Sequence, residues 1–309
     1  MKHFINTEEL TRREIDGLIE LSEMVAAKPQ TYANALKGKI VATIFFEPST
    51  RTRLSFESAI LKLGAGLIST ENGAESSSAR KSETIEDTVK VLSGYADAIV
   101  MRHTDNNSVI RAASVSPVPV INGGSGSSAH PSQSLLDAYT IKRHKGTLDG
   151  VKLAVCGDLK LGRTANSLIK LLSKYDGLQV WALSVVGMEL TPDVVEFMEQ
   201  NKIPYNVCES FDDIPKDVDV IYMTRFQKER ADDGLNVWTR ANTVNPASLI
   251  LTPQVVKRFS DSTIVLHPLP RVDEIDMEID NDPRAKYFEQ AHNGVPTRMA
   301  VLLKVLGGA

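Results

Sequence analysis

The sequence predicts an α/β protein built from two doubly wound parallel-sheet domains that are joined by interdomain helices, with an active site in the cleft between them. Three observations support this. The length of 309 residues suggests two domains. Strand-like and helix-like segments alternate along the chain. The first strand-like run, residues 40–46, is apolar on both faces, as strands inside a parallel sheet are.

The individual elements follow from local patterns. Leu18, Leu21 and Val25 recur at helical spacing, and Thr11 with Glu14 has the form of a capping box. The predicted strands are short β-rich runs bounded by turn residues, and the predicted helices carry apolar residues three and four positions apart. Strands are predicted at 40–46, 97–101, 117–121, 151–156, 179–183, 218–223 and 263–266, and helices from residue 51 and at 84–94, 132–144, 163–174, 193–200 and 298–306.

The boundary between the domains is expected around the helix 132–144, because a second strand-first unit restarts at Val151. We expect the C-terminal helix to return to the first domain. The predicted domains are residues 1–131 with 293–309, and residues 132–292. A cleft between two such sheets is where α/β proteins usually bind small ligands.

Composition limits the classes of function. Apolar residues make up 42% and charged residues 24%, as in ordinary globular proteins, and the apolar stretches are too short to cross a bilayer. A net charge of -4 provides no general attraction to nucleic acid or to anionic lipid. The two cysteines, Cys156 and Cys208, are too few for a disulfide framework or a cysteine zinc site. This cysteine usage, together with an N-terminus that lacks a secretory apolar core, favours a cytoplasmic enzyme.

The first candidate motif is Ser49-Thr50-Arg51-Thr52-Arg53, which lies where the first strand turns into a helix. The N-terminus of a helix offers unpaired backbone N–H groups and the positive end of the helix dipole. Hydroxyl groups and guanidinium groups add directional donors that suit a phosphate. The motif therefore predicts a phosphate site, although an ordinary helix cap with solvated arginines is the alternative.

The second motif, residues 157–164, follows another strand and has the spacing of a P-loop, except that Arg163 replaces the lysine. Two interpretations remain open besides a nucleotide site. The glycines can serve backbone geometry alone, or the turn can direct Arg163 into the cleft.

Polar residues also follow other predicted strands. Arg102 and His103 follow one strand, Arg225 follows another and His267 follows the last, while His130 comes after the glycine-rich segment 123–128, which has the composition of a flexible loop. Residues past the carboxyl ends of parallel strands face the ligand crevice. A structural role is the alternative for each histidine, and it is favoured for His103 and His267.

Together these residues resemble the aspartate/ornithine carbamoyltransferase family over essentially the whole chain. Residues 223–230 and the run His267-Pro268-Leu269-Pro270 indicate the aspartate branch. The motifs that carry the resemblance are residues 46–53, 101–103, 130–133, 157–164, 223–230 and 267–271.

The resemblance implies transfer of a carbamoyl group from carbamoyl phosphate to the amine of L-aspartate, an early step of pyrimidine synthesis. It implies a carbamoyl phosphate domain followed by an aspartate domain, and a homotrimer whose active sites are shared between subunits. Regulatory chains are compatible with it. No metal and no organic cofactor are expected, because carbamoyl phosphate already carries an activated leaving group.

The resemblance also assigns roles to residues. Arg51, Thr52, Lys81, Arg102 and His130 are the expected catalytic residues, and Lys81 and Ser77, from the polar segment 76–84, are expected to come from a neighbouring subunit. The carbamoyl phosphate site is expected to comprise Ser49, Thr50, Arg51, Thr52, Ser77, Lys81, Arg102, His130, Gln133, Leu269 and Pro270. The aspartate site is expected to comprise Lys81, Arg163, Arg225 and Gln227, and domain closure is expected to use Glu47, Arg163 and Arg230.

Three alternatives remain. A carbamoyltransferase for another amine, such as ornithine, would need an acidic partner where this chain has Arg225, Lys228 and Arg230. A nucleotide-binding module built on residues 157–164 predicts magnesium-dependent ATP binding. A non-catalytic homologue would not need the full set of predicted catalytic residues.

Overall fold

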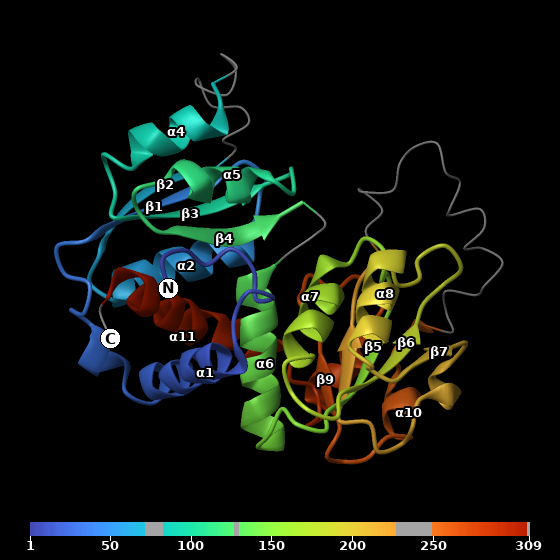
Figure 1. Cartoon of the computed structure of the whole chain (residues 1–309). Helices are drawn as coiled ribbons and strands as arrows, with labels where there is room; N and C mark the ends of the chain where they lie inside the picture. The colour runs from blue at the N-terminus through green and yellow to red at the C-terminus, as the bar shows by residue number, and fades with distance from the viewer. Residues whose placement is uncertain (72–82, 127–129, 227–248, 308–309) are drawn as a thin grey trace. The chain divides into compact units, whose positions relative to one another are not determined.

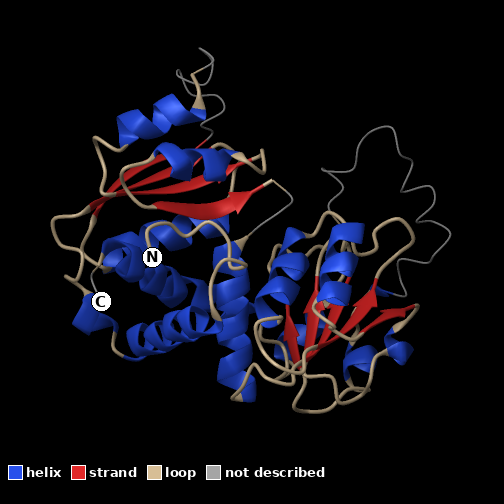
Figure 2. Cartoon of the chain, viewed as in Figure 1, coloured by secondary structure: helices blue, strands red, loops and turns tan. Residues whose placement is uncertain are grey.

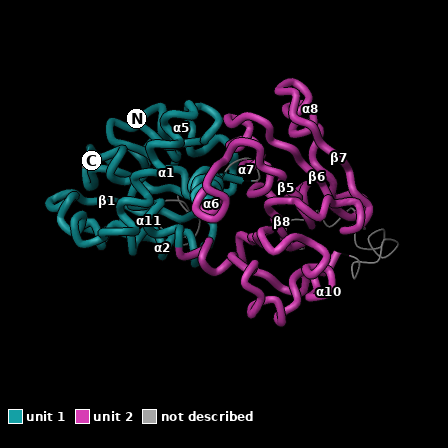
Figure 3. Tube along the Cα trace, turned by 90° about the horizontal axis from the view of Figure 1, so that it is seen from below, with its two compact units in different colours: residues 1–139, 293–309 teal, residues 140–292 magenta. Residues whose placement is uncertain are grey.

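The computed structural model describes residues 1–71, 83–126, 130–226 and 249–307. The chain forms two compact units, residues 1–139 with 293–309 (unit 1) and residues 140–292 (unit 2), which Figure 3 distinguishes by colour. Each unit contains one parallel sheet with helices beside it (Figure 2). The predicted fold class is confirmed.

The sheet of unit 1 has the strand order β2-β1-β3-β4, and its described neighbours are all parallel. Phe45 pairs with Arg102, and His103 pairs with Ser125. The carboxyl ends of β1, β3 and β4 therefore meet at one edge of the sheet. The strands are β1 (Ile40–Phe45), β2 (Gly66–Glu71), β3 (Ala98–His103) and β4 (Val120–Ser125).

Helices cover both faces of this sheet, with α4 and α5 on one face and α1, α2 and α11 on the other (Figure 1). The predicted capping box at the start of α1 is present, because the Thr11 hydroxyl accepts from the Glu14 N–H while the Glu14 carboxylate accepts from the Thr11 N–H. The helical elements of the N-terminal part are α1 (Arg12–Ala27), η1 (Pro29–Tyr32), α2 (Thr50–Lys62), α4 (Ile85–Leu92), α5 (Ser108–Val115) and α6 (Pro131–Lys145).

The sheet of unit 2 has the order β7-β6-β5-β8-β9, again with parallel neighbours. Helices α7 and α8 lie on one face and α10 on the other (Figures 1 and 3). The strands are β5 (Lys152–Cys156), β6 (Gln179–Leu183), β7 (Tyr205–Cys208), β8 (Val220–Met223) and β9 (Ile264–Leu266). The helical elements are α7 (Arg163–Leu172), α8 (Pro192–Gln200), η3 (Phe211–Asp213), α10 (Pro253–Val256), η6 (Met277–Asn281) and α11 (Tyr287–Leu306), which continues into unit 1.

The division between the units falls inside α6, between Tyr139 and Thr140, rather than before Ser132. The first turns of α6 belong to unit 1 because their side chains pack there. The Ser132 hydroxyl accepts from Arg298, and the Ser134 hydroxyl lies 3.5 Å from that of Thr7.

Five elements differ from the expectations. The glycine-rich segment predicted as a flexible loop begins as strand, since β4 continues through Ser125 and is buried throughout. Helix α11 starts at Tyr287, eleven residues before the expected start, and contains Pro296. Strands β2 and β7 and helix α5 were not predicted; β2 and β7 are largely exposed, so they lack the apolar pattern of a core strand.

Candidate active site

Unit 1 gathers four of the predicted residues at the carboxyl ends of neighbouring strands. Glu47 and Thr52 follow β1, Arg102 lies at the end of β3, and His130 follows β4. The connections from β1 and β3 leave the sheet in opposite directions along the strand order, which makes their junction the topological switch point of the sheet. Ligands of open α/β sheets bind at such points.

The N-terminus of α2 has the features of a phosphate site. Ser49 is its N-cap residue but makes no capping hydrogen bond with its side chain. Thr50 and Arg51 are exposed at the first turn. The first N–H groups of the helix and these side chains are therefore suited to hold an anion. Arg53 differs from Arg51, because its guanidinium group pairs with the Glu71 carboxylate at 2.9 Å.

Thr52 and His130 form the buried part of this half-site. The Thr52 Oγ1 lies 3.4 Å from the His130 Nε2, and both side chains are buried. Thr52 lies on the first turn of α2, and His130 directly precedes α6. Two polar groups held together at two helix starts can donate to an oxygen that develops negative charge.

Arg102 is held at the same edge by contacts within unit 1. Its guanidinium group pairs with Glu47 at 3.0 Å and donates to the Gly123 carbonyl oxygen at 3.4 Å. A Cβ atom on Gly123 would lie 3.3 Å from the Phe45 ring and from the Met101 carbonyl oxygen. Glycine is therefore used in β4 for close packing beside Arg102.

Two further predicted residues of unit 1 have internal partners. The Gln133 Nε2 donates to the Asp137 Oδ1 at 2.9 Å. The His103 Nδ1 accepts from the Asp105 N–H at 2.9 Å and lies 3.0 Å from the Ser108 hydroxyl. Burial lowers the pKa of His103. These contacts agree with the structural role that was favoured for His103.

In unit 2, the segment after β5 makes a tight turn against β8. Gly157 has a φ of 113°, and a Cβ atom there would overlap the Thr224 carbonyl oxygen. The Thr224 hydroxyl donates to the carbonyl oxygens of Cys156 and Asp158, at 3.1 and 3.2 Å. The Asp158 carboxylate accepts from the Leu161 N–H at 2.8 Å. These bonds fix the turn that leads to Arg163.

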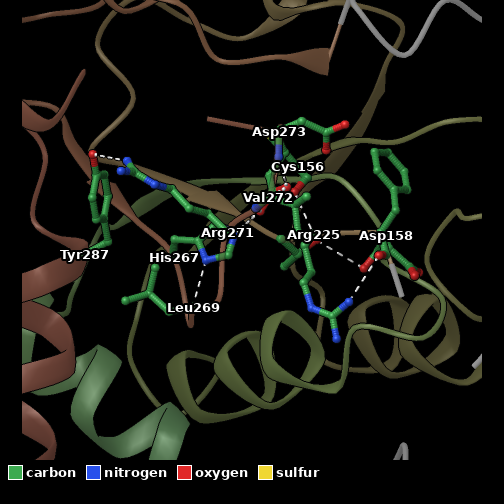
Figure 4. Close-up of polar contacts among 12 residues, drawn as sticks. Cys156, Asp158, Arg225, His267, Leu269, Arg271, Val272, Asp273 and Tyr287 are labelled. Carbon is green, nitrogen blue, oxygen red and sulfur yellow. Dashed lines mark hydrogen bonds and ion pairs between the residues drawn. The ribbon is translucent and has the colours of Figure 1, made fainter. Parts of the chain in front are cut away.

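Arg163 and Arg225 follow β5 and β8, the two strands at the switch point of the unit 2 sheet. Arg163 is the first residue of α7 and is buried. Arg225 (Figure 4) is partly buried and donates to the Phe226 carbonyl oxygen at 3.3 Å. Both arginines thus lie where the topology of unit 2 directs a ligand.

The segment after β9 is held by a buried histidine–glutamate pair. The His267 Nδ1 accepts from the Leu269 N–H at 2.8 Å (Figure 4). Its Nε2 therefore carries the proton and donates to the Glu274 carboxylate at 2.7 Å. The neutral ring therefore orients Leu269, which has a φ of 55°. The favoured structural role of His267 agrees with these contacts.

Glu274 is held in its charged form. Burial raises the pKa of its carboxyl, but hydrogen bonds from His267 and from backbone N–H groups outweigh burial and lower the pKa below its usual value.

Three residues that support the candidate site residues were not identified from the sequence, namely Asp137, Glu274 and Arg298. For Asp137 a signal existed, since it follows Gln133 by one helical turn.

Four predicted residues lie outside the described residues, namely Ser77, Lys81, Gln227 and Arg230. The expected closure contacts of Glu47 with Arg163 and Arg230 remain predictions. Among the described residues, no helix is long and apolar enough to cross a membrane. The same part of the chain contains no group of three or more His, Cys, Asp or Glu side chains arranged to hold a metal ion.

Two family models match the chain. The model described as "Aspartate/ornithine carbamoyltransferase, carbamoyl-P binding domain" matches residues 2–143. The model described as "Aspartate/ornithine carbamoyltransferase, Asp/Orn binding domain" matches residues 149–305.

Individual relatives cover the chain almost completely. The chain is 43% identical to the aspartate carbamoyltransferase catalytic subunit of Methanocaldococcus jannaschii over 312 residues, covering 99% of this chain and 98% of the relative. It is 42% identical to aspartate carbamoyltransferase 1, chloroplastic, of Pisum sativum over 304 residues, covering 98% of this chain and 78% of the relative. The Trypanosoma cruzi aspartate transcarbamoylase in complex with carbamoyl phosphate and aspartate superposes with a TM-score of 0.90 at 34% identity, covering 98% and 96% of the two chains.

Proposed function

The chain belongs to the aspartate/ornithine carbamoyltransferase family, and we propose that it transfers the carbamoyl group of carbamoyl phosphate to the amine of L-aspartate, forming N-carbamoyl-L-aspartate and phosphate in pyrimidine synthesis. The observation that carries this proposal is the full-length similarity to relatives named aspartate carbamoyltransferase. A relative of the same fold is described in complex with both substrates.

Unit 1 supplies the carbamoyl phosphate half-site in this proposal. Ser49, Thr50, Arg51 and the first N–H groups of α2 bind the phosphate. Thr52, Arg102 and His130 surround the carbonyl oxygen, and Gln133 faces the carbamoyl nitrogen. Ser77 and Lys81 reach the site from a neighbouring subunit, and Leu269 and Pro270 of unit 2 present carbonyl oxygens to the amine.

The reaction forms a bond between the aspartate nitrogen and the carbonyl carbon and breaks the bond from that carbon to the phosphate oxygen. Negative charge develops on the carbonyl oxygen, where Thr52, Arg102 and His130 stabilise it as preorganised donors. The amine loses a proton to the departing phosphate, which lies beside it. His130 is therefore a donor to the oxygen rather than a general base.

Aspartate carries two carboxylates, and Arg163 and Arg225 supply two guanidinium groups for them, with Gln227 beside them. Closure of the cleft would be stabilised by Glu47 with Arg163 and Arg230. Closure expels water and orients the amine, so part of the rate comes from positioning.

We also propose a homotrimer with shared active sites, located in the cytoplasm. Exposed apolar side chains on α2 and at the edge strand β2 (Leu54, Leu61 and Ile68) support burial against another subunit. Both cysteines are free, which agrees with a reducing compartment. The M. jannaschii relative is named a catalytic subunit, which makes additional regulatory chains compatible with this proposal.

The test is a transfer assay in which the purified full chain receives carbamoyl phosphate with either L-aspartate or L-ornithine, in the presence of a metal chelator. We expect N-carbamoyl-L-aspartate to form and citrulline not to form. Citrulline as the main product would overturn the assignment to aspartate. Magnesium-dependent ATP binding without carbamoyl transfer would instead support the nucleotide-binding alternative.

A further inference from the structure

The amide of Gln133 is tied to a buried carboxylate. Its Nε2 donates to the Asp137 Oδ1 at 2.9 Å, and the two residues are one turn apart on α6. The exposed fraction is 8% for Gln133 and 0% for Asp137. Water therefore has little access to compete for the Asp137 carboxylate, and this hydrogen bond controls how the amide is oriented.

Asp137 lies in the field of a second buried charge, that of Arg298 on α11. Burial lowers the pKa of Arg298 to about 10, while the nearby Asp137 carboxylate acts to raise it. Arg298 thus remains charged at neutral pH and lies within electrostatic range of the Asp137 carboxyl group.

Contacts from three helices keep the Arg298 guanidinium in place. It lies 5.0 Å from the centre of the Phe56 ring on α2, and its Nη2 donates to the Ser132 hydroxyl on α6 at 3.4 Å. A Cβ atom on Gly294, one turn earlier on α11, would overlap the Nη1 atom. Glycine at this position therefore provides the space that the guanidinium occupies.

This arrangement determines which end of the amide faces away from Asp137. The NH₂ group of Gln133 faces Asp137, because its Nε2 donates to the Asp137 Oδ1. The amide oxygen, an acceptor, must then point the other way. The carbamoyl group differs from an acetyl group by carrying an NH₂, a hydrogen-bond donor, in place of a methyl.

We propose that Asp137 and Arg298 are positioning residues that orient the Gln133 oxygen to accept from the carbamoyl NH₂, so that the site selects carbamoyl phosphate over acetyl phosphate. This inference rests on the proposed function and extends it to the choice of donor substrate. Asp137 and Arg298 act through Gln133 and need no contact with the substrate.

The experiment compares two probes, with the KM for carbamoyl phosphate and the competitive Ki of acetyl phosphate measured on the full chain. In Gln133→Leu we expect the Ki/KM ratio to fall about 3- to 10-fold, as expected for the loss of one hydrogen bond. In Asp137→Asn the partner also has a donor group, so the Gln133 amide can turn over, and we expect a fall of similar size. The double variant Arg298→Met/Asp137→Asn replaces both residues together, so the buried Arg298 charge is not left beside an altered partner.

Inorganic phosphate binding distinguishes positioning from a damaged fold. We expect each variant to bind phosphate as the parent chain does, because the N-terminus of α2 is unchanged. The matched control is Glu86→Gln with Arg111→Met, an exposed ion pair of unit 1 at 3.4 Å, which should leave the ratio unchanged.

An unchanged ratio in Asp137→Asn and in the double variant, with intact phosphate binding and carbamoyl transfer, would overturn this inference while leaving the proposed function standing. A parent chain without carbamoyl transfer would instead remove the proposed function itself. A fall in phosphate affinity equal to the fall in carbamoyl phosphate affinity would also contradict the positioning role, because it would show general damage to the site.

Discussion

The Nε2 of His130 lies 3.4 Å from the Oγ1 of Thr52, although the two residues are 78 positions apart in the sequence. The parallel pairing of β1, β3 and β4 produces this proximity, because the strands that precede the two helix starts end at the same edge of the sheet. We therefore interpret the two side chains as one group of donors.

For His130→Ala we expect kcat to fall about 10²- to 10³-fold, the usual effect of removing one donor to a developing negative charge. Thr52→Val should also lower kcat. Steady-state kinetics at saturating concentrations of both substrates measures kcat for each variant. Ser55→Ala is the control, since the Ser55 hydroxyl donates to backbone oxygens of its own helix. Parental transfer by His130→Ala would remove His130 from this role.

Arg225→Ala should raise the KM for aspartate far more than the KM for carbamoyl phosphate, because Arg225 is proposed to bind a carboxylate of aspartate. A hydrogen bond to a charged group contributes about 1.5–3 kcal/mol, which predicts a rise of about 10- to 100-fold. Initial rates measured against each substrate separate the two effects. Arg258→Ala, which removes the exposed partner of Asp212 in the same unit, should change neither KM. A larger effect on carbamoyl phosphate would refute the assignment.

Gly157→Ala should destabilise unit 2 by about 2–5 kcal/mol, the sum of the cost of a side chain at positive φ and the cost of overpacking against Thr224. Urea unfolding measures the loss. Gly150→Ala is the matched control, because Gly150 also has a positive φ of 74° but nothing lies within 4 Å of its Cβ position. It should lose about 1–2 kcal/mol. Equal losses in the two variants would show that contact with Thr224 is unimportant.

Glu274 gives a prediction for the pH dependence of stability. Its pKa is lowered in the folded state, so its contribution is present above the pKa of the unfolded chain, about 4.3, and is lost as the pH falls through the folded-state value. Glu274→Gln should lower the free energy of unfolding at pH 7 by about 1–3 kcal/mol, because buried N–H groups lose a charged acceptor. It should also weaken the loss of stability in acid.

Urea titrations between neutral and acid pH measure both effects of Glu274→Gln. Glu196→Gln, on the exposed side of α8, is the control and should retain the parental curve. An unchanged acid limb in Glu274→Gln would contradict the contribution assigned to this carboxylate.

Much of the fold followed from local sequence. The buried run of β1, the Thr11–Glu14 capping box and the alternation of strands and helices were predicted because each depends on neighbouring residues. The exposed edge strand β2 and the early start of α11 were not, since exposure weakens the apolar pattern and Pro296 and Gly294 are unusual inside a helix.

The sequence by itself determined which residues follow the strand ends, because side-chain chemistry and position along the chain are both local properties. It therefore identified the candidate site residues Ser49 to Thr52, Arg102, His130 and Arg225. Only the tertiary structure decided which of these candidates lie in contact and which neighbouring residues keep them in place. The contact of Thr52 with His130 depends on sheet register. The link from Gln133 through Asp137 to Arg298 depends on packing between α6 and α11, whose interacting residues are far apart in the sequence and carry no local signal of their contact.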